Sequence, residues 1–270
     1  MKVPKDSKIT VCGIARDVED TIVHDIKKIE KALEGFAEFA FVVVESLSND
    51  KTLRLLDSLE KSMRNFTHES IYHSPETLLK RSTRMAEARN AALNLQRLIH
   101  PDTDFVYVMD LDGVNRDLTS ASVLSCWEFD DWSVMTSNQP LGYYDILALR
   151  HDYWCPVDWG VAYEELIKYL PKETASYISV FSKSIKIAPE NPLIPVKSAF
   201  GGGAIYTADS LKDHMYSGLD DQGQEICEHV PLNLEIHNSG GSIYINPKLV
   251  NVRHLGRSHS IRKRIKNKFK

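Results

Sequence analysis

The chain of 270 residues is 43% hydrophobic and 26% charged, so it can bury a core without disulfides or a structural metal. Its net charge is −4, yet residues 257–270 hold seven basic residues and no acidic one, which leaves −11 for the rest. This acidic body argues against nucleic-acid binding. No apolar run approaches the roughly 20 residues of a membrane span, and residues 1–6 lack the apolar core of a signal peptide. Four scattered cysteines without a CxxC pair indicate free thiols, so we expect a cytoplasmic protein.

The first 110 residues alternate between strand-like and helix-like patterns. Ile22, Ile26, Ile29 and Leu33 recur at helical spacing, and Gly35 is a stop signal. The predicted order is strand 9–14, helix 22–33, strand 39–45, helix 52–63, a brief strand at 71–72, a helix from Pro75 to Arg97 and strand 105–109. This alternation is typical of an α/β fold in which helices flank a mostly parallel sheet.

Polar residues gather where three of these strands end. Ala15, Arg16 and Asp17 follow the first strand, the segment from Glu45 to Asp50 follows the second, and the segment from Asp110 to Asp112 follows the fourth. Ligands of open parallel sheets bind beyond the carboxyl ends of the strands. We therefore expect a binding site at this edge of the sheet.

The second half is less regular. Residues 151–195 hold tryptophans and prolines with one helical stretch at 163–169, and we expect them to form a wall on the substrate side. The other predicted elements are strands at 133–138 and 146–150, a glycine triplet at 201–203 that leads into a strand, a helix at 225–239, and a last strand at 242–246 that stops at Pro247.

Asp110 and Asp112 carry the clearest chemistry, because they stand one residue apart just past an apolar strand. In an extended segment they share one face, so both can approach one hard cation. Mg²⁺ or Mn²⁺, held by a few carboxylates and by substrate phosphates, suits such a pair. A solvated acidic turn is the alternative interpretation.

Other candidate residues are weaker when each is taken alone. Arg89 can reach phosphates near the aspartates from its helix, although helical spacing alone favours an ordinary helix with a pair of opposite charges for Arg84 to Asn90. Glu228 and His229 stand side by side at the start of a helix and could supply a general base. His254 could bind a metal, although a single histidine is more often structural or exposed.

In their order along the chain these residues resemble a glycosyltransferase of the GT-A type. The matching segments are residues 11–17, Ala88 to Asn90, Asp110-Leu111-Asp112, Gly201 to Gly203, and Glu228-His229 followed by His254. Segments 144–150, 200–206 and 227–229 further resemble capsule-associated mannosyltransferase-like enzymes and related bacterial and large-virus glycosyltransferases. The resemblance spans roughly residues 8–256, which implies one GT-A domain over 1–256 and a separate tail over 257–270.

The resemblance implies a nucleoside-diphosphate-sugar donor, a glycan or lipid-linked acceptor, and a Mn²⁺ or Mg²⁺ ion that neutralises the departing diphosphate. It places the metal on Asp110, Asp112 and His254. It places the donor on Ala15, Arg16, Asp17, Glu45, Asn49, Asp50, Arg89, Asp110, Leu111 and Asp112. It places the acceptor near Tyr144, Asp145, Arg150, Phe200, Gly201, Gly202 and Gly203.

One departure concerns the base. Inverting GT-A enzymes commonly carry Glu-Asp where this chain has Glu228-His229, so either residue here could take the acceptor's proton. We expect inversion. Two other classes compete, a sugar-phosphate nucleotidyltransferase and a non-catalytic sugar-nucleotide or glycan-binding module. The nucleotidyltransferase class usually has a glycine-rich loop with Arg and Lys after the first strand, which Ala15-Arg16-Asp17 does not match. A binding module needs no base, so the presence of both aspartates and of Glu228 argues against that class.

The basic tail has an amphipathic pattern. Ile261, Ile265 and Phe269 recur at helical spacing among basic residues, so a helix there could lie on an anionic membrane surface. A disordered charged end is the alternative. Membrane contact would place the protein peripherally on the inner face of a membrane.

Overall fold

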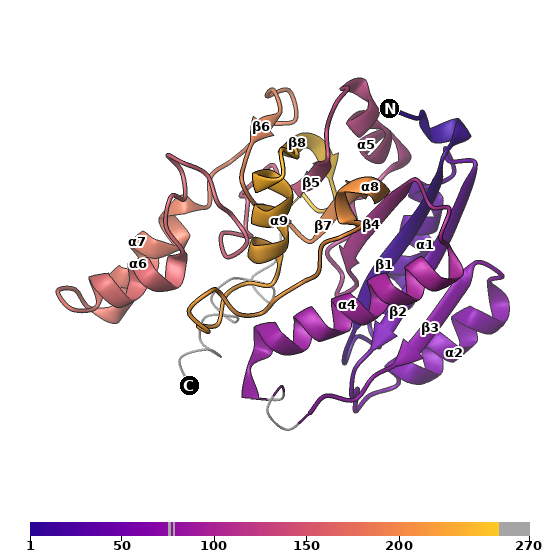
Figure 1. Cartoon of the computed structure of the whole chain (residues 1–270), viewed down its shortest axis with the longest axis horizontal. Helices are drawn as coiled ribbons and strands as arrows, with labels where there is room; N and C mark the ends of the chain where they lie inside the picture. The colour runs from indigo at the N-terminus through magenta and orange to yellow at the C-terminus, as the bar shows by residue number, and fades with distance from the viewer. Residues whose placement is uncertain (75–76, 78, 254–270) are drawn as a thin grey trace.

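The computed structural model describes residues 1–74, 77 and 79–253. They form one eight-stranded sheet with helices packed against it (Figure 1). The strands are β1 (Lys8–Ala15), β2 (Glu38–Glu45), β3 (Phe66–Ser70), β4 (Phe105–Asp110), β5 (Val134–Asn138), β6 (Ile194–Pro195), β7 (Gly203–Thr207) and β8 (Ile243–Val250). Their order is β3-β2-β1-β4-β7-β5-β8-β6. The pairs among β3, β2, β1 and β4 are parallel, and β7 runs antiparallel to both β4 and β5.

Helices cover both faces of the sheet because successive strand residues point to opposite sides. Val11 and Phe41 pack toward α1 and α2, whereas Cys12 and Val42 pack toward α4 and α9. Figure 1 shows α4 and α9 in front of the sheet, and α6 with α7 projecting away from it. The α-helices are α1 (Ile22–Ala32), α2 (Thr52–Ser62), α4 (Arg81–Ile99), α5 (Ser120–Leu124), α6 (Trp159–Leu166), α7 (Lys172–Ser179), α8 (Ala208–Leu211) and α9 (His229–Asn238).

The predicted α/β architecture is confirmed, and its regular first half follows the predicted order. The prediction of a strand at 71–72 is wrong, because the third strand is β3, which ends at Ser70. β3 lies at the edge of the sheet and is half exposed, so its sequence lacks an apolar run. α4 begins at Arg81, because Lys80 before it has extended backbone angles, and Thr77 and Leu79 are helical. The predicted helix start at Pro75 lies outside the described residues.

In the second half, the predicted elements differ more from those of the structure. The expected strand at 146–150 is a buried turn, in which the amide of Leu149 donates to the carbonyl of Ile146. β8 continues through Pro247 to Val250 because a register shift between Thr136 and Asn138 relaxes the ladder beside it. The last helix begins at His229 rather than at residue 225. Within the described residues, none of the helices has both the length and the apolar content that crossing a membrane requires.

Candidate active site

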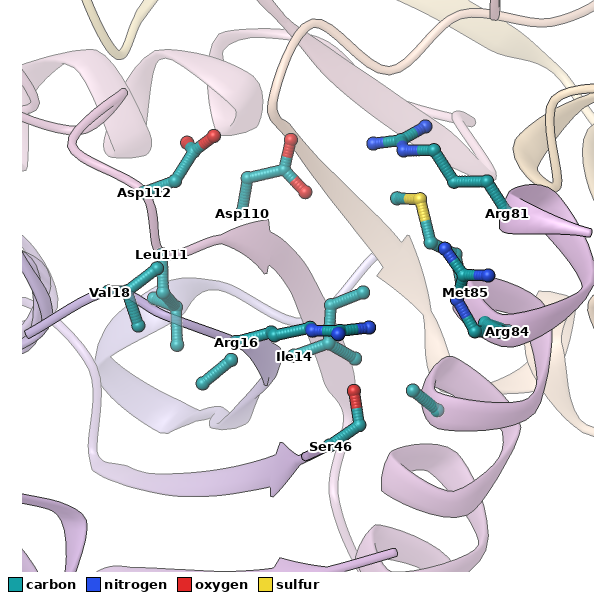
Figure 2. A pocket seen from close by; sticks show the side chains of 12 residues that line it. Ile14, Arg16, Val18, Ser46, Arg81, Arg84, Met85, Asp110, Leu111 and Asp112 are labelled. Atoms are coloured by element: carbon teal, nitrogen blue, oxygen red, sulfur yellow. The ribbon is translucent and has the colours of Figure 1, made fainter. Parts of the chain in front are cut away.

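A cavity of about 250 Å³ opens at the carboxyl ends of the parallel strands. Its two long walls carry opposite charges (Figure 2). Asp110 and Asp112 extend from the end of β4 on one side, and Arg81 and Arg84 extend from the first turns of α4 on the other. The guanidinium of Arg16 reaches toward the α4 side. The other lining residues are Ile14, Ala15, Val18, Ser46, Met85, Ala88 and Leu111.

Arg89 joins two carboxylates that are far apart in the sequence. Its Nη2 donates to Oδ1 of Asp110 over 2.8 Å, and its Nε donates to Oε1 of Glu228 over 2.9 Å. Arg89 and Glu228 are both only 2% exposed. Burial alone would lower the pKa of Arg89, but the charges of Glu228 and Asp110 raise it above its ordinary value. The cation therefore stays charged and couples the start of α9 to the end of β4.

An aromatic cluster encloses this buried cation. The ring of Phe200 stacks on His229 with centroids 3.6 Å apart, and the guanidinium of Arg89 lies 4.9 Å from the Phe200 ring centre. Tyr216 contacts both Arg89 and His229. Burial, and then the charge of Arg89, lower the pKa of His229 well below its ordinary value. The imidazole is therefore neutral near pH 7 and a weaker base than an exposed histidine.

The loop after β4 is held from several sides. The amide of Gly113 donates to Oδ2 of Asp25 over 2.8 Å, and the Thr21 hydroxyl donates to the Leu111 carbonyl. Asn115 donates to the carbonyl of Asp110. Asp25 is fully buried, and burial raises its pKa to about 6. These contacts fix the backbone of the segment that carries both aspartates. Asp25 was not among the residues that the sequence pattern indicated.

The two loops after β1 and β2 bind each other. Oδ1 of Asp17 accepts from the amide of Asn49, and Asp50 accepts from the amides of Glu19 and Thr52. Oε2 of Glu45 accepts from the hydroxyl of Ser70. The predicted donor residues Asp17, Glu45, Asn49 and Asp50 thus hold the rim together, whereas Ala15, Arg16, Asp110, Leu111 and Asp112 line the cavity itself.

The glycine triplet shapes the junction between β7 and β4. Gly201 and Gly202 have φ values of +66° and +81°, which favour glycine. A Cβ on Gly201 would lie 2.5 Å from the backbone oxygen of Ser137. The amide of Gly201 donates to Asp145, and the carbonyl of Gly202 accepts from the amide of Asp110 over 3.0 Å. The triplet therefore positions the end of β4.

The remaining predicted acceptor residues are mostly buried. Tyr144 and Asp145 are 7% and 8% exposed. Arg150 forms an ion pair with Asp158 and donates to the carbonyls of Leu147 and Leu149. These contacts support the turn at 146–150. The ring of Phe200, also a predicted acceptor residue, contacts the buried cation of Arg89.

Sequence reasoning gave Arg84 no role and missed Arg81, Met85 and Tyr216. A signal for the two arginines exists, since they stand three residues apart on the helix face that also carries Ala88. Tyr216 lies in a loop and has no sequence signal. His254 and residues 257–270 lie outside the described residues, so the metal role of His254 and the membrane role of the tail stay predictions.

The chemistry of Asp110 and Asp112 fits a divalent metal. Figure 2 shows both carboxylates on the β4 side of the cavity. Oδ1 of Asp110 already accepts from Arg89, which leaves its second oxygen for an ion. Within the described residues, no group of three or more His, Cys, Asp or Glu side chains could hold a metal. Two carboxylates suit Mg²⁺ or Mn²⁺ when substrate phosphates and water supply the remaining ligands.

Comparisons with known proteins identify the fold. No protein-family model and no curated protein matches the chain. Among solved structures, the mannosyltransferase PcManGT from Pyrobaculum calidifontis, in complex with GDP-Man and Mn²⁺, matches with a TM-score of 0.53 and 13% identity. The match covers 98% of this chain and 61% of that one.

Two further structures match at lower TM-scores. TarS 1-349 from S. aureus with UDP-GlcNAc gives 0.48 at 15% identity, over 88% of this chain and 55% of that one. Glucosyl-3-phosphoglycerate synthase from Mycobacterium tuberculosis, with Mn²⁺, UDP and phosphoglyceric acid, gives 0.44 at 13% identity, over 88% and 67%. The chain thus spans less than two thirds of PcManGT and TarS. The fold is that of GT-A glycosyltransferases, as the sequence resemblance predicts.

Proposed function

We propose that this protein transfers a sugar from a nucleoside-diphosphate sugar to a hydroxyl group of a glycan or lipid-linked acceptor. The observation that carries the proposal is the chain of contacts from Asp110 through Arg89 to Glu228, beside a cavity at the strand ends. It ties a candidate base to a candidate metal ligand at the edge where ligands of α/β sheets bind. The fold shared with PcManGT, whose structure holds GDP-Man and Mn²⁺, supports this interpretation.

We assign the base to Glu228 rather than to His229. The lowered pKa of His229 makes its imidazole a poor proton acceptor, and its ring is stacked on Phe200. Oε1 of Glu228 accepts from Arg89, and its second oxygen lies 3.8 Å from the sulfur of Cys227, a weak donor. That second oxygen is the one that would accept the acceptor's proton.

The proposed reaction is a single displacement. The acceptor oxygen forms a bond to the anomeric carbon and loses its proton to Glu228. The bond from that carbon to the diphosphate oxygen breaks, and its electron pair leaves with the nucleoside diphosphate. Attack from the face opposite the leaving group inverts the anomeric centre. A divalent ion, when bound, would neutralise charge on the departing diphosphate.

Within this scheme Asp110 and Asp112 would hold the metal, and Ala15, Arg16 and Ser46 would line the donor's place in the cavity. Arg89 is a positioning residue, because it fixes the carboxylates of Asp110 and Glu228 relative to each other. Phe200 and Tyr216 would keep water away from this cation and so strengthen both contacts.

The experiment is a screen of nucleotide sugars for thermal stabilisation in the presence of Mn²⁺, followed by assays of donor hydrolysis with the best ligand. Binding raises the melting temperature by mass action, so a true donor should stand out from the others. We expect the wild type to hydrolyse that donor slowly and Asp112→Ala to lose metal-dependent hydrolysis. Full metal-dependent activity in Asp112→Ala would refute the site. Stabilisation without any turnover, even with acceptors added, would favour a binding module.

The basic tail over residues 257–270 is proposed to hold the protein on an anionic membrane, where a lipid-linked acceptor would lie. Its amphipathic pattern of Ile261, Ile265 and Phe269 supports this proposal. Flotation with vesicles that contain anionic lipid tests it. We expect the full chain to float and a chain shortened to residue 256 to remain unbound. Equal flotation of the two chains would rule the proposal out.

A further inference from the structure

The loop between α8 and α9, residues 212–228, runs along α4 (Figure 1). Near the end of α4, the guanidinium of Arg97 donates to the carbonyl of His214 over 3.2 Å. At the start of α4, the amide of Ser82 donates to Oε1 of Glu225 over 2.9 Å. The helix therefore sets the course of the chain that leads into the candidate base.

The loop lies directly on the backbone of α4 at Gly218. A Cβ on Gly218 would lie 2.3 Å from the backbone nitrogen of Thr83 and 2.4 Å from the carbonyl carbon of Ser82, closer than nonbonded atoms approach. Thr83, Asn90 and Arg97 stand seven residues apart, so they share one stripe of the helix. Each of the three contacts the loop, and this stripe therefore carries it.

Asn90 stands in the middle of this stripe and binds Tyr216 twice. Its Nδ2 donates to the carbonyl of Tyr216 over 2.9 Å, and its Oδ1 accepts from the amide of Tyr216 over 2.8 Å. A side-chain amide has both a donor and an acceptor, so one residue of α4 satisfies both backbone polar groups of this loop residue. The position of Tyr216 is therefore fixed to α4.

The ring of Tyr216 covers the buried cation of Arg89. Its centre lies 5.9 Å from the guanidinium carbon of Arg89 and 5.4 Å from the centre of the His229 ring, which it meets at 83°. Tyr216 is only 4% exposed. Beneath this cover, Arg89 donates to Glu228 over 2.9 Å. Water that reached this pair would weaken it, so the place of the ring affects the contact that orients Glu228.

We propose that Asn90 is a positioning residue for sugar transfer, which acts through Tyr216 on the contact between Arg89 and Glu228. The inference rests on the proposed function, in which Glu228 is the base. Without Asn90 the ring of Tyr216 shifts, and the carboxylate of Glu228 spends less time aligned with the attacking hydroxyl. Binding of the donor changes less, because the backbone of Asp110 is held by contacts of its own loop.

The test measures kcat and the donor KM of Asn90→Ala, of Tyr216→Ala and of the double variant, with the donor found in the screen. We expect Asn90→Ala to lose about 30- to 100-fold in kcat, while the donor KM stays within about threefold of wild type. In the Tyr216→Ala background the same substitution should change kcat by less than about threefold, because Asn90 acts through Tyr216. Wild-type kcat in Asn90→Ala, or losses that multiply in the double variant, would overturn the inference.

Arg97→Ala is the matched control, because Arg97 binds the same loop at His214, two helical turns from Asn90. It should lower the melting temperature about as much as Asn90→Ala does and keep kcat within about threefold of wild type. Equal losses of kcat in the two variants would show that any loosening of the loop slows transfer, and would overturn the specific role of Asn90.

A second readout does not depend on activity. Burial, and then the charge of Arg89, hold the pKa of His229 well below its ordinary value. A shifted Tyr216 ring would admit water, so Asn90→Ala should raise the pKa of His229, followed by NMR, whereas Arg97→Ala should leave it unchanged. An unchanged pKa in Asn90→Ala would contradict the inference and leave the proposed function standing. Absence of sugar transfer by the wild type would refute the proposed function, and the role of Asn90 in transfer with it.

Discussion

The two halves of the molecule bury different kinds of side chain around one sheet. Up to Asp110 the strands pair in parallel with unbroken register, and Gln96 is the one side-chain amide buried in the described part of that half. After Asp110 the strands pair in both parallel and antiparallel directions. In the described part of this second half, six amide side chains are buried, namely Asn115, Asn138, Gln139, Asn233, Asn246 and Asn251.

This difference follows from the backbone. A helix, or a strand paired within a sheet, has partners for its backbone polar groups, whereas a buried irregular loop needs side chains to provide them. Gln139 and Asn251 both donate to the carbonyl of Gly201, and Asn138 donates to the carbonyls of Ile187 and Pro247. Both halves therefore have an apolar core, and the second half adds hydrogen bonds from buried side-chain amides to its loops. The candidate site lies where the two halves meet.

The largest effect is expected at Arg89, the residue that joins the halves. Arg89→Met leaves the buried Glu228 and the partly buried Asp110 without their counter-ion, so stability should fall by about 3–5 kcal/mol. Sugar transfer should fall by about 1,000-fold or more, because the candidate base and metal ligand lose their fixed positions. Thermal unfolding and initial rates measure the two effects. Arg89→Lys keeps the positive charge without the forked guanidinium, so its stability and its rate should lie between those of the wild type and of Arg89→Met. Wild-type stability and rate in Arg89→Met would refute the coupling of Asp110 to Glu228 through Arg89.

A second test compares two glycines of the second half. Gly202 has φ +81°, and a Cβ there would lie 2.7 Å from the Tyr144 hydroxyl, whereas Gly240 has φ +91° with nothing within 4 Å. Gly240→Ala should therefore destabilise by strain alone, about 1 kcal/mol, and Gly202→Ala by about 2–4 kcal/mol. Denaturant unfolding gives both values. Equal losses would show that the loop beside β4 is less tightly packed than described.

The third prediction concerns Asp25, the buried carboxylate of the first half. Its pKa is raised from 3.8 to about 6, so between these values the folded state holds a proton that the unfolded state has lost. Its contribution to stability is present at low pH and is lost as pH rises through about 6, by up to about 3 kcal/mol. Asp25→Asn should flatten this part of the pH profile of unfolding, measured in EDTA. An unchanged profile would contradict the assignment.

The smallest effect is expected at Asn251, one of the buried amides. Asn251→Ala removes one of the two donors to the Gly201 carbonyl and leaves Gln139 as the other, so stability should fall by about 1–2 kcal/mol. Transfer should fall more than stability alone explains, because the glycine loop positions Asp110. For comparison, Ile29→Val on α1 should lower stability by a similar amount without changing KM for the donor. If Asn251→Ala and Ile29→Val changed the rate of transfer equally, the proposed difference between the two halves would be wrong.

The same contrast explains how much could be predicted from the sequence. The period of Ile22, Ile26 and Ile29 fixes an amphipathic helix, and an apolar strand before Asp110 places the aspartates at the sheet edge. The link from Arg89 to Glu228 spans 139 residues and depends on where α9 docks, which no local pattern encodes. The apolar run at 146–149 is buried in a turn, and its sequence did not reveal this because a buried strand and a buried turn can carry the same apolar residues.

In the proposed reaction, Glu228 accepts the proton of the acceptor hydroxyl. The most direct measurement is the rate of sugar transfer by Glu228→Gln with the donor found in the screen, next to binding of the nucleoside diphosphate. The control Glu235→Gln changes an exposed residue of the same helix. We expect Glu228→Gln to lose about 100- to 10,000-fold in kcat while nucleotide binding stays within about threefold of wild type. Transfer at the rate of the Glu235→Gln control would contradict this assignment.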